Sequence, residues 1–307
     1  MEINKKKRFR LPSRKEIAFL IMLLPALVIT LVFAYLPMMG LFIAFKEYDP
    51  LIGIFGSPWA ADYGFANFIE IFRTPGLVEA IWNTLYLNIL SLALTFPTPI
   101  IFALLLDEVR NKAYKSVVQT VSYLPHFLST IAVVGIVGSL FSQYGVINDV
   151  LKMLGLERII FFAKSEWFIP IYLIINVWKG LGWNSIVYLS AIAGISTELY
   201  EAATIDGAGR FKQVWYITIP SLMPTAMILL ILSLGGIFGS SFDLIYGLQN
   251  GVDWTMDVIA TAVYKNGILE GQYGLSTALG LMQGGIALIL TFGVNAISKK
   301  VSEISMW

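Results

Sequence analysis

Long apolar runs are the main feature of the hydrophobic pattern along this chain. Six runs with few charges recur between shorter polar segments, and each is continuously apolar instead of alternating between polar and apolar positions. Continuous runs are typical of membrane-spanning helices, whereas the strands of a membrane barrel alternate. A span needs about 20 apolar residues. The pattern therefore predicts six transmembrane helices, at residues 17–37, 80–106, 117–141, 168–193, 219–245 and 275–297.

Composition supports a membrane protein and argues against other classes. Residues of the set AVILMFWYC make up 57% of the 307 positions and charged residues 13%, whereas soluble domains are about half apolar and about a quarter charged. We expect an all-α polytopic membrane protein with a basic cytoplasmic tail at 1–16, a transmembrane domain at 17–297 and a cytoplasmic tail at 298–307. A net charge of +1 predicts no nucleic-acid partner. The chain has no cysteine and one histidine, His126, so no thiolate or clustered imidazole metal site is expected.

The distribution of Lys and Arg predicts the orientation of the six spans, because cytoplasmic connections carry an excess of these residues. With the N-terminus inside, the inner side holds the basic tail together with Arg110, Lys112, Lys115, Arg210, Lys212, Lys299 and Lys300. Both termini are therefore expected in the cytoplasm. The first run is too long for a signal peptide and no A-x-A site closes it, so we expect an uncleaved helix.

Prolines and aromatic residues add detail to this topology. Prolines lie within or at the ends of most predicted spans, at Pro25, Pro37, Pro97, Pro99, Pro125, Pro170, Pro220 and Pro224. Because proline removes a backbone donor, kinked helices are expected. The outer segments 46–79 and 143–167 are rich in Trp, Phe and Tyr, which predicts anchoring at the membrane interface.

One cytoplasmic connection differs from the others. Residues 196–220 form the sequence STELYEAATIDGAGRFKQVWYITIP. Ser196 is a good N-cap, and the turn signal Asp206-Gly207 should end the short helix that follows it. A second amphipathic stretch begins at Arg210, and Pro220 opens the fifth span. The pattern predicts a helix-turn-helix at the inner membrane surface, and an ordinary interfacial loop would fit it as well.

The spacing within this connection resembles the EAA loop of binding-protein-dependent ABC importer permeases. The matching positions are Glu201, Ala202, Ala203, Gly207, Ile217 and Pro220, while Ile219 stands where the family usually has Leu. The segments 80–85 and 242–280, with Trp82-Asn83-Thr84, Tyr273-Gly274 and Ser276-Thr277-Ala278, look like the carbohydrate-uptake branch. Tyr123-Leu124-Pro125-His126-Phe127 and Asp257-Val258-Ile259 are similar to the permeases for complex oligosaccharides.

This resemblance implies a fold, a set of partners and a coupling surface. The fold would be that of a type I ABC importer permease in the bacterial cytoplasmic membrane. The loop would be a coupling helix that docks in a cleft of a separate ATPase, through Glu201, Ala202, Ala203, Asp206, Gly207 and Phe211. This chain has no G-x-x-x-x-G-K-[ST] loop, so no catalytic residue is expected here, and ATP and Mg would bind the ATPase. Expected partners are a second homologous permease, two ATPases and an extracytoplasmic solute-binding protein.

Polar and aromatic side chains within the spans are the candidates for a sugar pathway, because polar groups that face lipid are costly. The candidates are Asn83, Asn176, Trp178, Lys179, Asn184, Tyr188, Asp243 and Gln283. The same residue types also form hydrogen bonds between helices. Lys179 either pairs with Asp243 or faces the pathway unpaired, and the second arrangement would favour acidic saccharides. His126 is expected to be a packing histidine and not a proton relay.

Three alternative functions stay open at this point. A permease of the same family could carry a solute other than a sugar. A secondary transporter driven by protons or sodium would share the helices and the polar interior, but it would leave the EAA loop unexplained. An intramembrane enzyme would need clustered catalytic groups, and no span holds a Ser/His or His/Glu constellation at suitable spacing.

Overall fold

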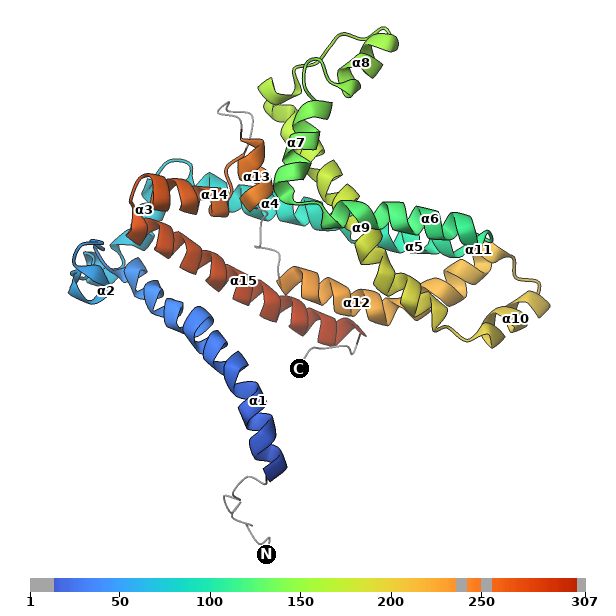
Figure 1. Ribbon diagram of the computed structural model, residues 1–307, viewed down its shortest axis with the longest axis horizontal. Coiled ribbons are helices and arrows are strands. Elements are labelled where there is room, and N and C mark those ends of the chain that lie inside the picture. Colours follow the sequence, from blue (N-terminus) through green and yellow to red (C-terminus); the bar gives the residue numbers. More distant parts are fainter. Residues whose placement is uncertain (1–13, 236–241, 250–255, 303–307) are drawn as a thin grey trace, which may run out of the picture.

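The computed structural model describes residues 14–235, 242–249 and 256–302, and the regular structure of these residues is helical (Figure 1). One isolated bridge, between Lys46 and Trp59, is the β pairing found among them. The predicted all-α class is therefore confirmed. The α-helices are α1 (Arg14–Thr30), α2 (Gly53–Gly56), α3 (Ala66–Arg73), α4 (Leu77–Thr95), α5 (Pro97–Asp107), α6 (Lys112–Tyr123), α7 (Thr130–Leu140), α8 (Val146–Met153), α9 (Phe168–Ala193), α10 (Thr197–Ile205), α11 (Arg210–Gln213), α12 (Ile219–Gly235), α13 (Phe242–Leu248), α14 (Ile259–Val263) and α15 (Tyr273–Ser302).

Four helical segments of the described residues are long and apolar enough to cross a bilayer. They are Ile17–Phe45, Leu77–Asp107, Arg210–Leu234 and Tyr273–Gly293. They correspond to the first, second, fifth and sixth predicted spans, with shifted ends. The first joins α1 to a π-helical turn and a 3-10 helix. At the other end of the chain, α15 continues beyond the predicted limit at residue 297.

The fifth predicted span, 219–245, corresponds only in part to the structure. Helical structure already begins at Arg210 and continues through a π-helical turn into α12, which ends at Gly235. Residues 236–241 lie outside the described residues, and Phe242 begins the separate helix α13. The described residues of the predicted span 219–245 are therefore α12 and the start of α13, and one span across all of these residues stays a prediction.

The third predicted span, 117–141, is not one straight helix. The segment Lys112–Phe127 meets α7 at an angle of 105°. Pro125 has no amide donor, and Leu128 adopts an extended backbone that ends the 3-10 turn Leu124–Phe127. Ser129 then starts α7, because its side chain accepts a hydrogen bond from the Ala132 amide at 3.2 Å. The proline pattern predicted kinking but not a break of this size.

Helix α9 has the bounds of the fourth predicted span but is not among the four segments that are long and apolar enough to cross a bilayer. Asn176, Lys179 and Asn184 lie in its middle turns. It nevertheless lies at the centre of the structure. One buried cluster joins α9 to α4, α7 and α13, and another joins it to α5 and α12. A third cluster packs α15 against α3, α4 and α14.

The two ends of the helical body carry different elements. In Figure 1 the connection with α10 and α11 lies at one end, beside the ends of α5 and α6, while α2 and α3 lie at the other. Helix α1 runs apart from the rest, and none of the residues in its most apolar window is buried. Such a surface suits contact with lipid or with another membrane helix.

Candidate functional site

The connection between α9 and α12 forms the expected helix and turn. The Ser196 side chain accepts a hydrogen bond from the Glu198 amide at 3.3 Å and thereby caps α10. The helix ends at Ile205 with Asp206 as its C-cap, and Gly207 has a φ of +75°, a left-handed conformation that suits glycine. Gln213 closes the turn by donating to Thr204 Oγ1 at 2.9 Å and to the Ala208 carbonyl at 3.1 Å.

This connection presents small, acidic and apolar groups on its exposed surface. Glu201, Ala202, Asp206 and Gly207 are exposed, and Ala203 is half-buried. Two apolar side chains stand out, because Phe211 is 80% exposed and Ile205 is 87% exposed. Exposed apolar side chains flanked by polar ones are typical of a protein-docking surface. Ile205 was not among the predicted residues, although it shares a face of α10 with Glu201 and its spacing from Glu201 would have indicated it.

Ion pairs connect this surface to the turn between α5 and α6. Arg210 Nη1 lies 2.9 Å from Glu108 Oε2. Across the same turn, Lys115 Nζ of α6 lies 3.3 Å from Asp107 Oδ1 at the end of α5. Sequence reasoning missed the first pair, because its members are 102 positions apart and nothing in either local sequence predicts the contact.

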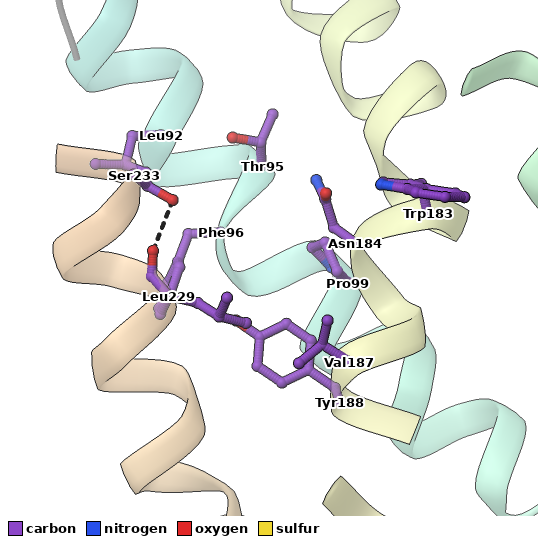
Figure 2. A pocket seen from close by; sticks show the side chains of 10 residues that line it. All are labelled: Leu92, Thr95, Phe96, Pro99, Trp183, Asn184, Val187, Tyr188, Leu229 and Ser233. Atoms are coloured by element: carbon purple, nitrogen blue, oxygen red, sulfur yellow. Dashed lines mark hydrogen bonds between the residues drawn. The ribbon is translucent and has the colours of Figure 1, made fainter. Parts of the chain in front are cut away.

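A cavity of about 160 Å³ lies between α4, α5, α9 and α12 (Figure 2). Figure 2 shows Thr95, at the end of α4, and Asn184, on α9, facing the space between these helices. The lining residues are Leu92, Thr95, Phe96, Pro99, Trp183, Asn184, Val187, Tyr188, Leu229 and Ser233. The Ser233 hydroxyl is turned back to the Leu229 carbonyl at 2.8 Å. Tyr188 is buried, whereas Trp183 is 42% exposed.

A second cavity of about 350 Å³ adjoins the first, because Thr95 and Asn184 line both. Its lining is mostly polar, from Ser91, Thr95, His126, Thr130, Asn176, Lys179, Gly180, Asn184 and Leu244. No Asp or Glu is among the residues that line either cavity. Together the two cavities form a space lined by amides, hydroxyls, aromatic rings and one lysine, which we call the polar chamber.

Lys179 and His126 both line the polar chamber, close to the break between α6 and α7. Lys179 Nζ donates a hydrogen bond of 3.4 Å to the Leu128 carbonyl. Among the described residues, no ion pair joins Lys179 to Asp243. His126 is exposed, and its ring stacks on Trp183 with 4.5 Å between centroids and 2° between planes. The expected packing role of His126 is thus filled by an exposed ring that stacks on Trp183.

The structure brings four of the eight predicted pathway residues together. Asn176, Lys179, Asn184 and Tyr188 line the polar chamber. Asn83, Trp178, Asp243 and Gln283 do not line it. Asn83 instead donates to the Asp257 carbonyl at 2.9 Å. Thr95 and Thr130 were missed, because hydroxyl side chains in helices commonly bond their own backbone and give little signal.

A polar network lies between α13 and α15, outside the membrane-spanning helices. The Asp257 carboxylate accepts hydrogen bonds from Lys265 Nζ at 2.8 Å, Gln249 Nε2 at 3.0 Å and Thr261 Oγ1 at 3.0 Å. Burial alone would raise the pKa of Asp257, but these hydrogen bonds and the charge of Lys265 lower this pKa below its ordinary value. The ionised carboxylate thus holds the two ends of this connection together.

Comparisons with known proteins give consistent results. Residues 95–303 match the family described as binding-protein-dependent transport system inner membrane component. Protein LplB of Bacillus subtilis is 41% identical, with 92% of this chain and 89% of that protein covered. The polygalacturonan/rhamnogalacturonan transport system permease protein YteP of the same organism is 39% identical, with 98% and 93% covered.

Solved structures show the same similarity. A chain of a bacterial ABC transporter involved in the import of the acidic polysaccharide alginate is 40% identical and superimposes with a TM-score of 0.86, covering 94% of this chain and 97% of that chain. A chain of a bacterial alginate ABC transporter, in complex with an alginate pentasaccharide-bound periplasmic protein, is 39% identical with the same TM-score, covering 95% and 98%.

Proposed function

This chain belongs to the binding-protein-dependent transport system inner membrane components, and we propose that it carries acidic oligosaccharides through an ATP-driven importer. It is a multi-pass permease subunit of an ABC importer and not a catalytic protein. The permease YteP is named for polygalacturonan and rhamnogalacturonan, and two structural relatives belong to alginate transporters. All three names refer to polysaccharides that contain acidic sugars, which supports an acidic cargo.

The observation that carries the proposal is the charge of the polar chamber. Among the described residues that line it, Lys179 is the one lysine or arginine, and none is an aspartate or glutamate. A charged group within a span should face a cavity or an acidic partner. A uronic-acid carboxylate could pair with Lys179, while Asn176 and Asn184 bond sugar hydroxyls. The ring of Trp183 offers a flat apolar face to a sugar ring.

The coupling surface supports the proposed partners. The exposed Ile205 and Phe211, with Glu201 next to the small Ala202 and Ala203, suit a cleft on a separate ATPase. We place this surface, and both termini, on the cytoplasmic side, where that ATPase would bind ATP and Mg. Because Trp183 and His126 are left exposed, a second homologous permease is proposed to complete the polar chamber, with two ATPases below and a solute-binding protein outside.

Replacing Lys179 with Met tests the cargo. The reconstituted importer, with its binding protein, would be given labelled trigalacturonate and, separately, the neutral methyl ester of the same trisaccharide. Relative to the unmodified importer, Lys179→Met should lose uptake of the charged sugar and retain that of the ester, while Lys179→Arg should retain both. Equal losses for both sugars would contradict the proposal. If Lys179→Met does not assemble but the double variant with Asp243→Asn does, Lys179 pairs with Asp243 and the acidic-cargo argument fails.

The coupling role is tested with two glycines of the same turn. A Cβ at Gly207 or at Gly209 would meet no atom within 4 Å, but only Gly207 has a positive φ. Alanine at Gly207 should therefore strain the turn by about 1–2 kcal/mol, whereas alanine at Gly209 should not. Gly207→Ala should weaken copurification of the ATPase, and Gly209→Ala should not. Uptake in ATP-free vesicles under an ion gradient would instead indicate a secondary transporter.

A further inference from the structure

Helix α6 connects the cytoplasmic end of the structure to the polar chamber. At its start, Asn111 caps the helix by accepting a hydrogen bond from the Tyr114 amide at 3.1 Å. At its other end the chain continues into the turn Leu124–Phe127, where His126 stacks on Trp183. The next residue, Leu128, offers its carbonyl to Lys179. Any movement of α6 along its axis therefore reaches the chamber directly.

A side-chain ion pair ties the turn between α5 and α6 to the coupling surface. The chain itself links that surface to α9 and α12, because α10 and α11 lie between these two helices. The link to α5 and α6 is the pair between Arg210 and Glu108, at 2.9 Å. Arg210 begins α11, only three positions after Gly207 at the tip of the turn. Lys115 of α6 in turn pairs with Asp107, next to Glu108.

The end of α6 beside the chamber packs too tightly against α9 to absorb such a movement by local compression. A Cβ placed on Gly182 of α9 would overlap the Ser122 carbonyl of α6. The two backbones are therefore in direct contact one residue before Trp183. Closely packed helices shift as rigid elements between discrete arrangements instead of deforming continuously. A displacement at Glu108 is thus expected to reach His126 and Trp183 with little loss.

We propose that Glu108 and Arg210 are positioning residues that transmit movement of the coupling surface through α6 to the polar chamber. Neither residue lines the chamber or was part of the predicted coupling set. The inference rests on the proposed function, since it assumes that an ATPase moves the coupling surface. Both side chains are largely exposed, with 43% and 57% of their surfaces accessible. Exposed ion pairs contribute little to stability, so breaking this one should leave folding and assembly intact.

The test compares the number of sugars transported per ATP hydrolysed in the reconstituted importer, using trigalacturonate with its binding protein. Glu108→Gln should lower this ratio by about 2- to 25-fold, with copurification of the ATPase and the basal ATPase rate unchanged. The charge-exchanged pair, Glu108→Arg with Arg210→Glu, should recover most of the loss. Glu166→Gln, which removes an exposed ion pair with Lys164 on the outer side, is the matched control and should change nothing.

A second readout follows the movement itself. The chain has no cysteine, so Phe127→Cys gives one thiol of this subunit beside the chamber. ATP should change its labelling rate by a thiol reagent, and Glu108→Gln should abolish that change. If the unmodified importer transports no trigalacturonate, the proposed function fails. If it transports normally and Glu108→Gln leaves both the transport ratio and the labelling change intact, the transmission role is overturned while the proposed function stands.

Discussion

Replacing Gly182 with Ala should separate α6 from α9 at the level of the polar chamber. The added Cβ would overlap the Ser122 carbonyl and would lie 2.9 Å from Ser122 Cβ, where ordinary contacts begin at 3.4 Å. The obstacle is backbone, so no side-chain rotation relieves it and the helices must move apart by more than half an ångström. Overpacking of this kind costs about 1–3 kcal/mol. Trp183 follows directly, so its stack with His126 should open as well.

The assay for this substitution is thermal unfolding of the purified importer, together with sugar uptake. Gly182→Ala should lower the apparent melting temperature and reduce uptake. Gly194→Ala at the end of the same helix is the control, because its Cβ would meet only the Ala191 carbonyl at 3.4 Å and the Ser190 carbonyl at 3.8 Å. Unchanged stability and uptake in Gly182→Ala would refute both the close approach of the helices and the rigid path from α6 to the chamber.

Two further predictions concern the segment 143–167 and the network around Asp257. Asn148 is fully buried and makes three hydrogen bonds, to the Ser142 carbonyl and to both backbone groups of Ile159. Asn148→Ala should destabilise the segment 143–167 by about 1–3 kcal/mol and speed its proteolysis, whereas Asp149→Asn should have a much smaller effect. The pKa of Asp257 is lowered from 3.8. The contribution of the ionised carboxylate to the free energy of unfolding should therefore be constant at neutral pH and disappear as the pH falls through that lowered pKa. The stability difference between the unmodified protein and Asp257→Asn should therefore persist from about pH 8 to pH 5 and shrink only below about pH 4. A difference that shrinks near pH 7 would contradict this assignment.

The features that sequence predicted well are those that local patterns determine. The cap at Ser196 and the turn at Gly207 depend on neighbouring residues, and both are present in the structure. The bounds of α9 follow from a long and mainly apolar run that holds one charged residue. The sharp break at Leu128 was not predicted, because Pro125 permits either a gentle kink or an end of the helix, and the choice depends on packing elsewhere.

Long-range contacts explain the remaining differences. Asn83 and Asn184 are the same residue type in similar apolar surroundings, yet only Asn184 lines the polar chamber, because Asn83 bonds the distant Asp257 backbone. No pattern within α4 distinguishes these outcomes. In the sequence, Glu108 is likewise an ordinary residue of a polar turn, and its contact with Arg210 is visible only in the structure. Whether a polar residue serves structure or transport is therefore decided by which helices meet.

The polar middle of α9 also has a consequence for the biogenesis of the protein. A lysine near the centre of a helix opposes insertion from the translocon by about 2.5–3.5 kcal/mol, and α9 carries Lys179 between Asn176 and Asn184. On its own, this helix should pass inefficiently from the translocon into the lipid bilayer. In the structure α9 packs against α5 and α12, and α12 is synthesised after it. We therefore expect the newly made α9 to wait at the translocon until α12 arrives, so that both helices enter the lipid together.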